Sequence, residues 1–452
     1  MIDHARMAAD RELEWSLYKP ASAGFLLRVI QGMPRLPAPD SNGCLSDSAA
    51  PQSRVELRHS EIKMCISMKA IELFSGIGGF RIACDSLGIE TVWANDINAK
   101  AAATYQARFG RSQFHEGDIT HFLETIPDHD ILTGGFPCQP FSSAGKKLGI
   151  EDMRGTLFEK IVYILQKKSP DYFVLENVKR LLSMDKGKHF ATILDALSKI
   201  GYLIEWRLVN AVYFGLPQNR ERIIIIGRKE HAPSSHLCNP EDLQQLTQRQ
   251  IKQAMDLDSW SAIEDHGAKF ETWGLALHGK FFHAKIHGFA EKTREVLLKE
   301  VLETRPDSRF FFTKDTLERI KKSDEVNKYI SGVEILYNQK GGARMGYSIF
   351  GINGLAPTLT CTASRHYERY RVGNEYRRLT NVEYARIQGF PDDHCDGISV
   401  YDQYTLYGNA VPPALVEWAL RKTVFNTGTV FNDLPRTRTT AAHTIENQME
   451  LL

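Results

Sequence analysis

The chain has 452 residues, and its 42% hydrophobic and 25% charged content is typical of a globular protein rather than a disordered, collagen-like or small disulfide-stapled chain. Lys and Arg number 56 against 55 Asp and Glu, so the net charge is +1 and no global basic field indicates a nucleic-acid partner. The 7 cysteines include no pair with the spacing of a zinc or redox motif, and no apolar run approaches the ~20 residues of a membrane span, so we expect reduced thiols in a cytoplasmic protein.

Residues 1–67 show no sustained hydrophobic periodicity, and residues 36–52 are rich in Pro, Ser, Asp and Gly. This composition predicts a poorly ordered N-terminal extension over 1–67. Met64 and Met68 both precede the first clear strand, so an upstream start assignment also explains the extension. Mass spectrometry of the native N-terminus separates the two explanations.

From Lys69 onward, short apolar runs alternate with helical patterns. The runs are 70–74, 91–94, 130–133 and 172–175, and the helical patterns include 80–87 and 157–168. Runs of this kind, apolar on both faces, predict a parallel sheet covered by helices, which is the α/β doubly wound class. Two further β-rich runs, 203–210 and 222–227, leave no room for a crossover helix, so we expect them to pair antiparallel.

The texture changes near residue 229 to Gln-rich, charged and irregular sequence. We therefore divide the chain into a first domain over 68–228, a second over 229–355, a C-terminal part over 356–424 and a flexible tail over 425–452. Residues 291–302 have helical spacing, and a later helix begins at a capping box formed by Thr380 and Glu383. A last helix is expected near 412–421.

In open α/β sheets the ligand site lies beyond the carboxyl ends of the strands, so these ends are the first place to look for chemistry. The first run ends in a glycine-rich turn, 74–79, and Asp96 ends the second run 20 positions after Gly76 (96 − 76 = 20). Together they suggest a nucleoside-containing cofactor, although a glycine turn is equally common as simple turn chemistry. Asp118, at a third strand end, is either a contact to an adenine amino group or a helix N-cap.

Groups suited to covalent catalysis stand at the next strand ends. Cys138 lies in a Pro-bracketed loop after the fourth run, and Glu176 ends the fifth. Gln218, Arg220 and Arg222 alternate on an extended chain and so share one face, which is either a site wall or, as we would favour from these residues alone, a solvated edge. A thiol, a carboxylate and a guanidinium pair beside a nucleoside-type loop describe covalent attack on an electron-poor ring.

At this point the sequence resembles the DNA (cytosine-5) methyltransferases of bacterial restriction-modification type. The resemblance covers about 68–421 and leaves out 1–67. Its motifs, in the family's order, are Phe74-x-Gly76-x-Gly78-Gly79, Pro137-Cys138-Gln139, Glu176-Asn177-Val178, Gln218-x-Arg220-x-Arg222, Arg378-Leu379-Thr380 with 385–391, and Gly408-Asn409-Ala410-Val411-Pro412. One departure is Asp96, where the family commonly carries Glu.

The resemblance implies a Rossmann-like fold, with a mostly parallel sheet plus an antiparallel strand, that binds S-adenosylmethionine. It makes 68–228 the catalytic domain and 229–355 a smaller target-recognition domain, with 356–424 completing both. The residues implied to line the cofactor pocket are Phe74, Gly76, Gly78, Asp96, Ile97, Asp118, Pro137, Leu157, Asn409 and Val411.

The resemblance also implies the chemistry. Cys138 adds to C6 of a flipped cytosine, while Glu176 acts at N3, Arg222 orients Glu176 and the base carbonyl, and Arg220 or a helix N-terminus favours the thiolate. No metal is required. The implied partner is double-stranded DNA, bound by a monomer. The usual separate partner is a cognate restriction endonuclease, and a solitary enzyme is equally compatible with the residues.

Cations and aromatics interleave at 365–371, followed by Arg377 and Arg378, which is either a DNA-contacting patch or a solvated charged loop. Three alternatives to the family's activity remain. A dehydrogenase is disfavoured because the glycine loop lacks the dinucleotide register, and a binding-only homologue because every catalytic position is intact. An RNA methyltransferase is disfavoured by the long stretch at 229–355.

Overall fold

The computed structural model describes residues 68–137, 156–230, 232–321, 324–338, 348–360, 368–426, 428–429 and 431. The chain divides into two units, Met1–Met64 and Cys65–Leu452, and every described residue belongs to the second. The predictions for 1–67, for Cys138 and for residues beyond 431 lie outside the described residues and stay predictions.

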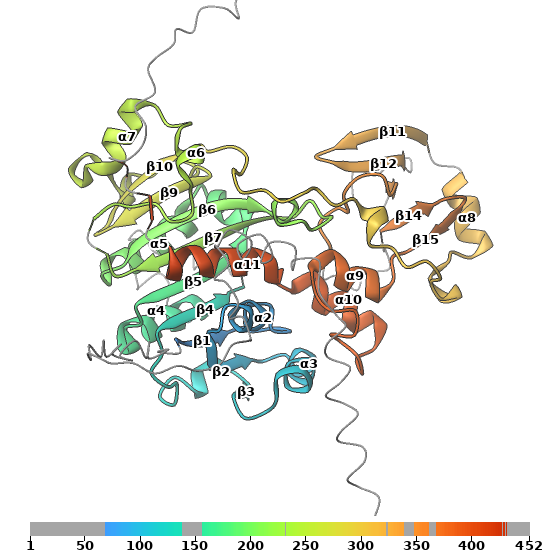
Figure 1. The fold of residues 1–452 in the computed structure, drawn as a ribbon, viewed down its shortest axis with the longest axis horizontal. Helices are drawn as coiled ribbons and strands as arrows, with labels where there is room; N and C mark the ends of the chain where they lie inside the picture. Colours follow the sequence, from blue (N-terminus) through green and yellow to red (C-terminus); the bar gives the residue numbers. More distant parts are fainter. Residues whose placement is uncertain are drawn as a thin grey trace, which may run out of the picture. The chain divides into compact units, whose positions relative to one another are not determined.

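The first five strands of the larger sheet are parallel, in the order β3-β2-β1-β4-β5 (Figure 1). They are β1 (Lys69–Leu73), β2 (Glu90–Asp96), β3 (Phe114–Glu116), β4 (Ile131–Gly135) and β5 (Tyr172–Val178). All four predicted apolar runs are strands here, so the doubly wound prediction is confirmed. The chain moves outward from β1 to β3 and then returns to the other side of β1, which makes the edge between β1 and β4 the switch point where such sheets bind ligands.

Five more strands extend this sheet in antiparallel fashion, in the order β7-β6-β9-β10-β8. They are β6 (Leu203–Asn210), β7 (Glu221–Arg228), β8 (Ser261–Ala262), β9 (Trp273–Leu277) and β10 (Lys280–Ala284), with the short helices α6 (Pro240–Leu243) and α7 (Gln248–Met255) between β7 and β8. The predicted antiparallel pairing of 203–210 with 222–227 is confirmed, and the sheet has more antiparallel strands than the one expected. Because β9 pairs with β6, the sheet continues past residue 229; the domain division there stays a prediction.

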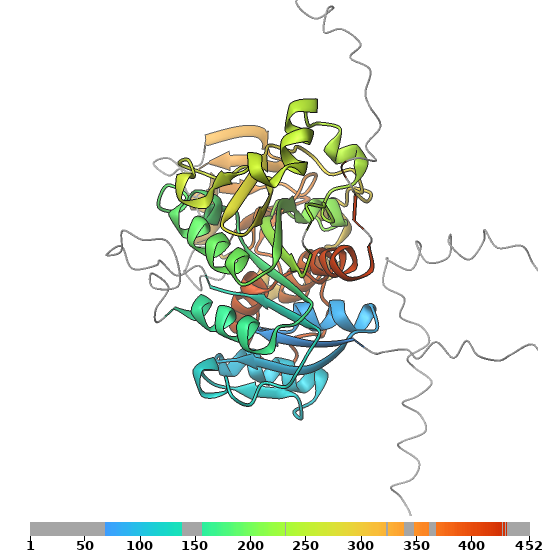
Figure 2. The ribbon, with the colours of Figure 1, turned by 90° about the vertical axis from the view of Figure 1, so that its left-hand side faces the viewer.

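Helices cover both faces of the sheet. They are α2 (Gly79–Ser86), α3 (Ala99–Phe109), α4 (Leu157–Lys168), α5 (Lys188–Lys199) and α11 (Pro413–Leu420). Within β7, Ile223 and Ile225 pack into one core with α4 and α5, whereas Ile224 and Ile226 pack into another with α2 and α11. Figure 2 shows these two helix pairs on opposite sides of the sheet. The strands are therefore apolar on both faces because both faces are buried.

A smaller sheet has the order β11-β12-β13-β14-β15. Its strands are β11 (Asp324–Ile330), β12 (Val333–Asn338), β13 (Ser348–Phe350), β14 (Arg369–Val372) and β15 (Glu375–Arg377), and it is accompanied by α8 (Lys314–Lys321), α9 (Asn381–Gln388) and α10 (Val400–Asn409). The predicted capping box of Thr380 and Glu383 begins α9 and is confirmed. Phe350 and Tyr370 of this sheet share a core with residues of α9 and α10.

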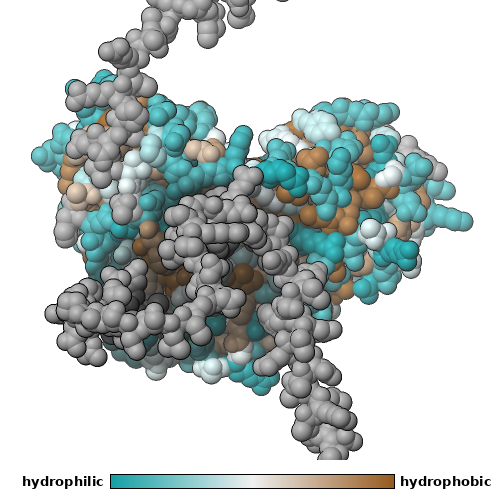
Figure 3. Space-filling model, in the orientation of Figure 1, coloured by the Kyte–Doolittle hydropathy of each residue, from teal (hydrophilic) through white to brown (hydrophobic). Residues whose placement is uncertain are grey.

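The edge strand β11 leaves large apolar side chains in solvent. Tyr329 and Ile330 are 59% and 50% exposed. Figure 3 shows hydrophobic surface among hydrophilic surface in the part of the molecule that holds the smaller sheet. No helix among the described residues is long and apolar enough to cross a membrane.

The prediction of a helix over 291–302 is wrong, because this segment holds only a 3-10 turn at Leu298–Glu300. Its backbone bonds to distant segments instead: Leu298 N–H donates to Gly354 O at 2.9 Å and Lys299 N–H to Ile352 O at 3.1 Å. These tertiary hydrogen bonds replace the ones that a helix would have made.

Candidate functional site

A pocket of about 470 Å³ opens at the carboxyl ends of β1, β2, β4 and β5, beside the end of α10. This is the switch point of the sheet. Nine of the ten predicted cofactor residues line it: Phe74, Gly76, Asp96, Ile97, Asp118, Pro137, Leu157, Asn409 and Val411. The tenth, Gly78, is not among the lining residues. The pocket therefore brings together nine residues that the family resemblance implied, at the edge of the sheet where strand topology puts a ligand site.

The glycine turn between β1 and α2 packs closely on two neighbours. Gly78 is the N-cap of α2 with a φ of 85°, and an added Cβ would lie 2.4 Å from the Phe109 ring. At Gly79 an added Cβ would lie 2.2 Å from the carbonyl oxygen of Val411. Glycine is required at both positions, and the turn is held between α3 and the segment that follows α10.

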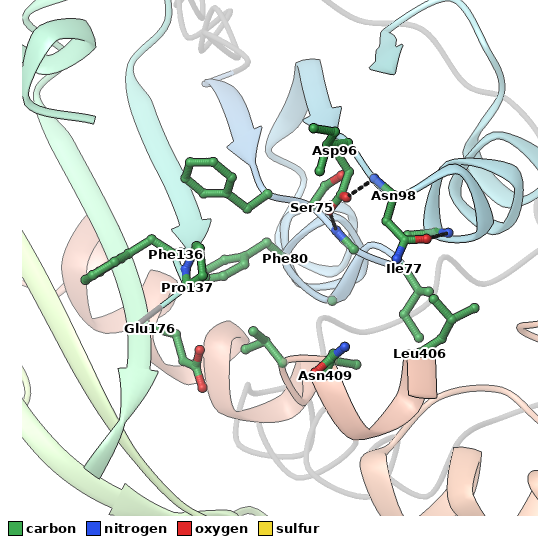
Figure 4. Close-up of a pocket in the computed structure, with 18 of the residues that line it drawn as sticks. Ser75, Ile77, Phe80, Asp96, Asn98, Phe136, Pro137, Glu176, Leu406 and Asn409 are labelled. Atoms are coloured by element: carbon green, nitrogen blue, oxygen red, sulfur yellow. Dashed lines mark hydrogen bonds between the residues drawn. The ribbon is translucent and has the colours of Figure 1, made fainter. Parts of the chain in front are cut away.

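Asp96 ties the end of β2 to the glycine turn. Its Oδ2 accepts from Gly76 N–H and its Oδ1 from Asn98 N–H, both at 2.8 Å, and Figure 4 shows this group on one wall of the pocket. Burial raises the pKa of Asp96, while these hydrogen bonds oppose the rise. The next side chain, Ile97, is 70% exposed at the pocket. A carboxylate beside an exposed apolar side chain suits a ligand that carries a hydroxyl-bearing ring next to a flat aromatic ring.

Of the two interpretations of Asp118, the helix N-cap is confirmed, and the contact to an adenine amino group stays a prediction. Its carboxylate accepts from Thr120 N–H at 2.8 Å and so caps the 3-10 helix Ile119–His121. These bonds from the Thr120 side chain and backbone lower the pKa of Asp118. Asp118 also lines the pocket.

Glu176 and Arg222 form an ion pair on the opposite side of the pocket from Asp96. Arg222 Nε lies 2.7 Å from Glu176 Oε1, and the two side chains are only 11% and 10% exposed. Antiparallel pairing of β5 with β7 produces this contact. Arg222 pairs with Val178, and Glu176 lies two positions before Val178 and so on the same face of the sheet. A buried guanidinium holds the carboxylate in one orientation toward the pocket.

Cys138 itself lies outside the described residues, but the chain on either side of 138–155 reaches the pocket. Pro137 and Leu157 both line it. Asn177, to which the sequence assigned no individual role, donates from Nδ2 to Phe136 O at 2.9 Å. Its position beside Glu176 in the same motif was the available signal. This bond fixes the backbone two residues before Cys138.

Arg220 is 2% exposed and donates to three backbone carbonyls. The acceptors are Leu359 at 3.2 Å, Gly408 at 3.0 Å and Ala410 at 2.9 Å. Gln218 is fully buried, accepts from Leu359 N–H at 3.2 Å and donates to Gln388 Oε1 at 3.1 Å. The solvated-edge interpretation of this extended segment is therefore wrong, because Gln218, Arg220 and Arg222 are all buried.

Residues of the predicted basic patch do not form one exposed surface among the described residues, because some of them are buried. Residues 361–367 lie outside the described residues. Arg377 is buried and pairs with Glu383 at 2.7 Å, so it is not a surface contact. Tyr370 is buried as well, since the interleaving at 369–371 is strand alternation in β14. No group of His, Cys, Asp and Glu among the described residues is arranged to hold a metal ion.

Comparison with known proteins shows what this chain is similar to. A family model described as C-5 cytosine-specific DNA methylase matches residues 68–424. The chain is 35% identical over 355 residues to Type II methyltransferase M.NgoBI of Neisseria gonorrhoeae, an alignment that covers 78% of this chain and 92% of the relative. It is 31% identical over 377 residues to Type II methyltransferase M.HhaI of Haemophilus parahaemolyticus, covering 82% of this chain and 98% of the relative.

A solved structure shares the fold. The crystal structure of a Spodoptera frugiperda DNMT2 variant matches with a TM-score of 0.53 and 20% identity, over 79% of this chain and 99% of that chain. At this identity the likeness shows the fold alone.

Proposed function

This chain belongs to the C-5 cytosine-specific DNA methylase family, and we propose that it transfers a methyl group from S-adenosylmethionine to C5 of a flipped cytosine through a covalent Cys138 adduct at C6. The observation that carries the proposal is the buried pair of Glu176 and Arg222, 2.7 Å apart, in the same pocket as the glycine turn and Asp96. A carboxylate of fixed orientation beside a cofactor pocket is what activation of a base ring requires.

The residues of the pocket fit S-adenosylmethionine. Gly76 has a φ of 55° and no heavy atom within 4 Å of an added Cβ, so the backbone there is open to a ligand. Asp96 would accept from the ribose hydroxyls, and Ile97 would lie against the adenine. Asn409, the last residue of α10, and Val411, just after this helix, close the pocket. The bound molecule supplies an electrophilic methyl group.

The target cytosine has to leave the duplex because stacking shields C5 and C6. The Cys138 thiolate then forms a bond to C6 while Glu176 donates a proton or a strong hydrogen bond to N3, which offsets the charge entering the ring. The resulting enamine makes C5 the nucleophile toward the methyl group. A base next removes the C5 proton, the C6–S bond breaks, and the thiolate leaves.

Arg222 and Arg220 have different roles in this proposal. Arg222 holds Glu176 toward the base. Arg220 positions the backbone of Gly408 and Ala410, two residues that line the pocket, through its hydrogen bonds to their carbonyls. Its buried charge also favours a thiolate nearby.

The partner would be double-stranded DNA, bound by a monomer. The relatives named above are Type II methyltransferases, which favours a role in protecting DNA within a restriction-modification system beside a separate endonuclease. We place the protein in the cytoplasm for the same reason.

The Cys138→Ser variant tests the proposal. We expect it to transfer no labelled methyl group to genomic DNA, because a serine hydroxyl is too weak a nucleophile at neutral pH. It should bind S-adenosylmethionine in calorimetry as the wild type does. Methyl transfer by the variant at the wild-type rate would contradict the mechanism, and a wild type that does not bind S-adenosylmethionine would contradict the cofactor assignment.

A further inference from the structure

The turn that follows α9 lies directly against the glycine turn. His394 Nε2 is 2.7 Å from the carbonyl oxygen of Ile77, a residue 317 positions earlier in the chain. Because a carbonyl oxygen only accepts, the hydrogen of the imidazole must be on Nε2. His394 is 3% exposed, so this bond is shielded from water.

Neighbouring groups hold the imidazole in place from several sides. Its ring centroid lies 4.8 Å from that of Phe390 and 6.1 Å from that of Phe109. Arg108 Nε donates to His394 O at 3.0 Å, and Arg108 Nη2 lies 2.6 Å from Asp393. Burial also lowers the pKa of His394 to about 4, which keeps the ring neutral at physiological pH. The donor is thus preorganised.

Its acceptor occupies a sensitive place. Ile77 lines the pocket, and it stands between Gly76 and Gly78, whose φ angles are 55° and 85°. Because glycine is conformationally permissive, a turn with glycine on both sides of Ile77 can adopt other conformations once its backbone groups lose their partners. The Ile77 side chain packs in the same core as Phe390 and Leu406, so the turn is bound to the C-terminal part through both backbone and side chain.

We propose that His394 is a positioning residue that holds the glycine turn in its cofactor-binding conformation and thereby sets the affinity for S-adenosylmethionine. The inference rests on the proposed function in that it names S-adenosylmethionine as the ligand. His394 does not line the pocket and acts through Ile77. Its effect should therefore fall on cofactor binding and not on the chemical step.

A pair of substitutions separates the hydrogen bond from the packing. His394→Phe keeps an aromatic ring between Phe390 and Phe109 but removes the donor. His394→Gln keeps an N–H donor at a similar reach but removes the ring. We expect His394→Phe to raise the Kd for S-adenosylmethionine about 5- to 10-fold, with kcat at saturating cofactor within about twofold of wild type. His394→Gln should stay within about twofold of the wild-type Kd.

An unchanged Kd for His394→Phe would overturn the proposal. Equal losses of affinity in both variants would also overturn it, because they would indicate that packing alone matters. If His394→Phe does not fold, Arg108→Gln is the second variant. It removes the contacts of the partly exposed Arg108 to His394 O and Asp393, so it loosens the turn that carries His394 and should raise the Kd for S-adenosylmethionine. An unchanged Kd would contradict the proposal. Hydrogen exchange at the amides of Ile77–Gly79 provides a readout without cofactor. It should be faster in His394→Phe even if the wild type proves not to bind S-adenosylmethionine, an outcome that would refute the proposed function instead.

Discussion

At the scale of single residues, the tightest constraint on the cofactor turn is at Gly79. A Cβ at this position would lie 2.2 Å from Val411 O, a backbone atom that cannot move aside by a rotamer change. We expect Gly79→Ala to destabilise the fold by about 1–3 kcal/mol, measured by urea unfolding. Gly267→Ala is the matched control, because an added Cβ there meets nothing within 4 Å. Equal stability of the two variants would show that the contact is not restrictive.

The role of Glu176 is also a question about one residue. Glu176→Gln keeps the shape of the side chain but removes the charge paired with Arg222 and the acid. We expect the rate of methyl transfer in single turnover to fall about 10²- to 10⁴-fold, with cofactor binding unchanged. Glu221→Gln, which breaks an exposed pair with Lys179, should leave the rate unchanged. A fully active Glu176→Gln enzyme would remove Glu176 from the mechanism.

His394 makes a prediction about pH. Burial holds its pKa at about 4, below the ~6.5 of an unfolded chain, so between these values the unfolded state binds the extra proton. The contribution of His394 to stability is therefore present above pH 6.5 and is lost as the pH falls toward 4, by up to about 1.4 kcal/mol per pH unit. Urea unfolding at pH 7 and pH 5 should show a larger loss for wild type than for His394→Phe. Equal losses would mean that His394 does not titrate in this way.

At the scale of elements, a buried ion pair fixes α9 to β15. Glu383 is fully buried and accepts from Arg377 at 2.7 and 2.8 Å and from Thr380 N–H at 2.8 Å. Glu383→Gln leaves the Arg377 charge buried without its partner, so we expect a loss of about 3–5 kcal/mol in the free energy of unfolding. Glu417→Gln, which affects the exposed pair with Arg421, should cost less than about 1 kcal/mol. Similar values for the two variants would contradict this account of α9.

Elements also show how far sequence reasoning reaches. The parallel strands and α2, α4 and α11 could be predicted because local periodicity and capping residues determine them. Asp96 and Glu176 could be placed at the site because the ends of parallel strands share one edge. The segment 291–302 was wrongly predicted to be helical because its backbone partners, Ile352 and Gly354, lie about 50 residues away.

Contacts between distant segments could not be predicted in the same way. The alternation of Gln218, Arg220 and Arg222 indicates a shared face, but it does not show that the face is buried against Leu359 and Gly408. The bond between His394 and Ile77 spans 317 residues and has no local signature. Only tertiary packing reveals such partners.

At the scale of the whole described unit, one hydrophobic core joins the smaller sheet to the cofactor turn. It includes Phe350 and Tyr370 from the sheet, Ile387 from α9, Tyr407 from α10 and Ile77 from the glycine turn. A buried polar chain runs beside it, since Gln388 binds both Gln218 and the carbonyl of Tyr407. The part expected to read DNA and the part expected to bind the cofactor are therefore packed through shared residues.

The most direct test of the central claim is made on DNA. The wild-type chain and Cys138→Ser are expressed in a host that lacks cytosine methylation, and the genome is sequenced after enzymatic conversion of unmodified cytosines. Cysteine-dependent methylation predicts protected cytosines in one short sequence motif with the wild type and none with Cys138→Ser. A fully converted genome from soluble wild-type protein that binds S-adenosylmethionine, or the same protected motif with the variant, would contradict it.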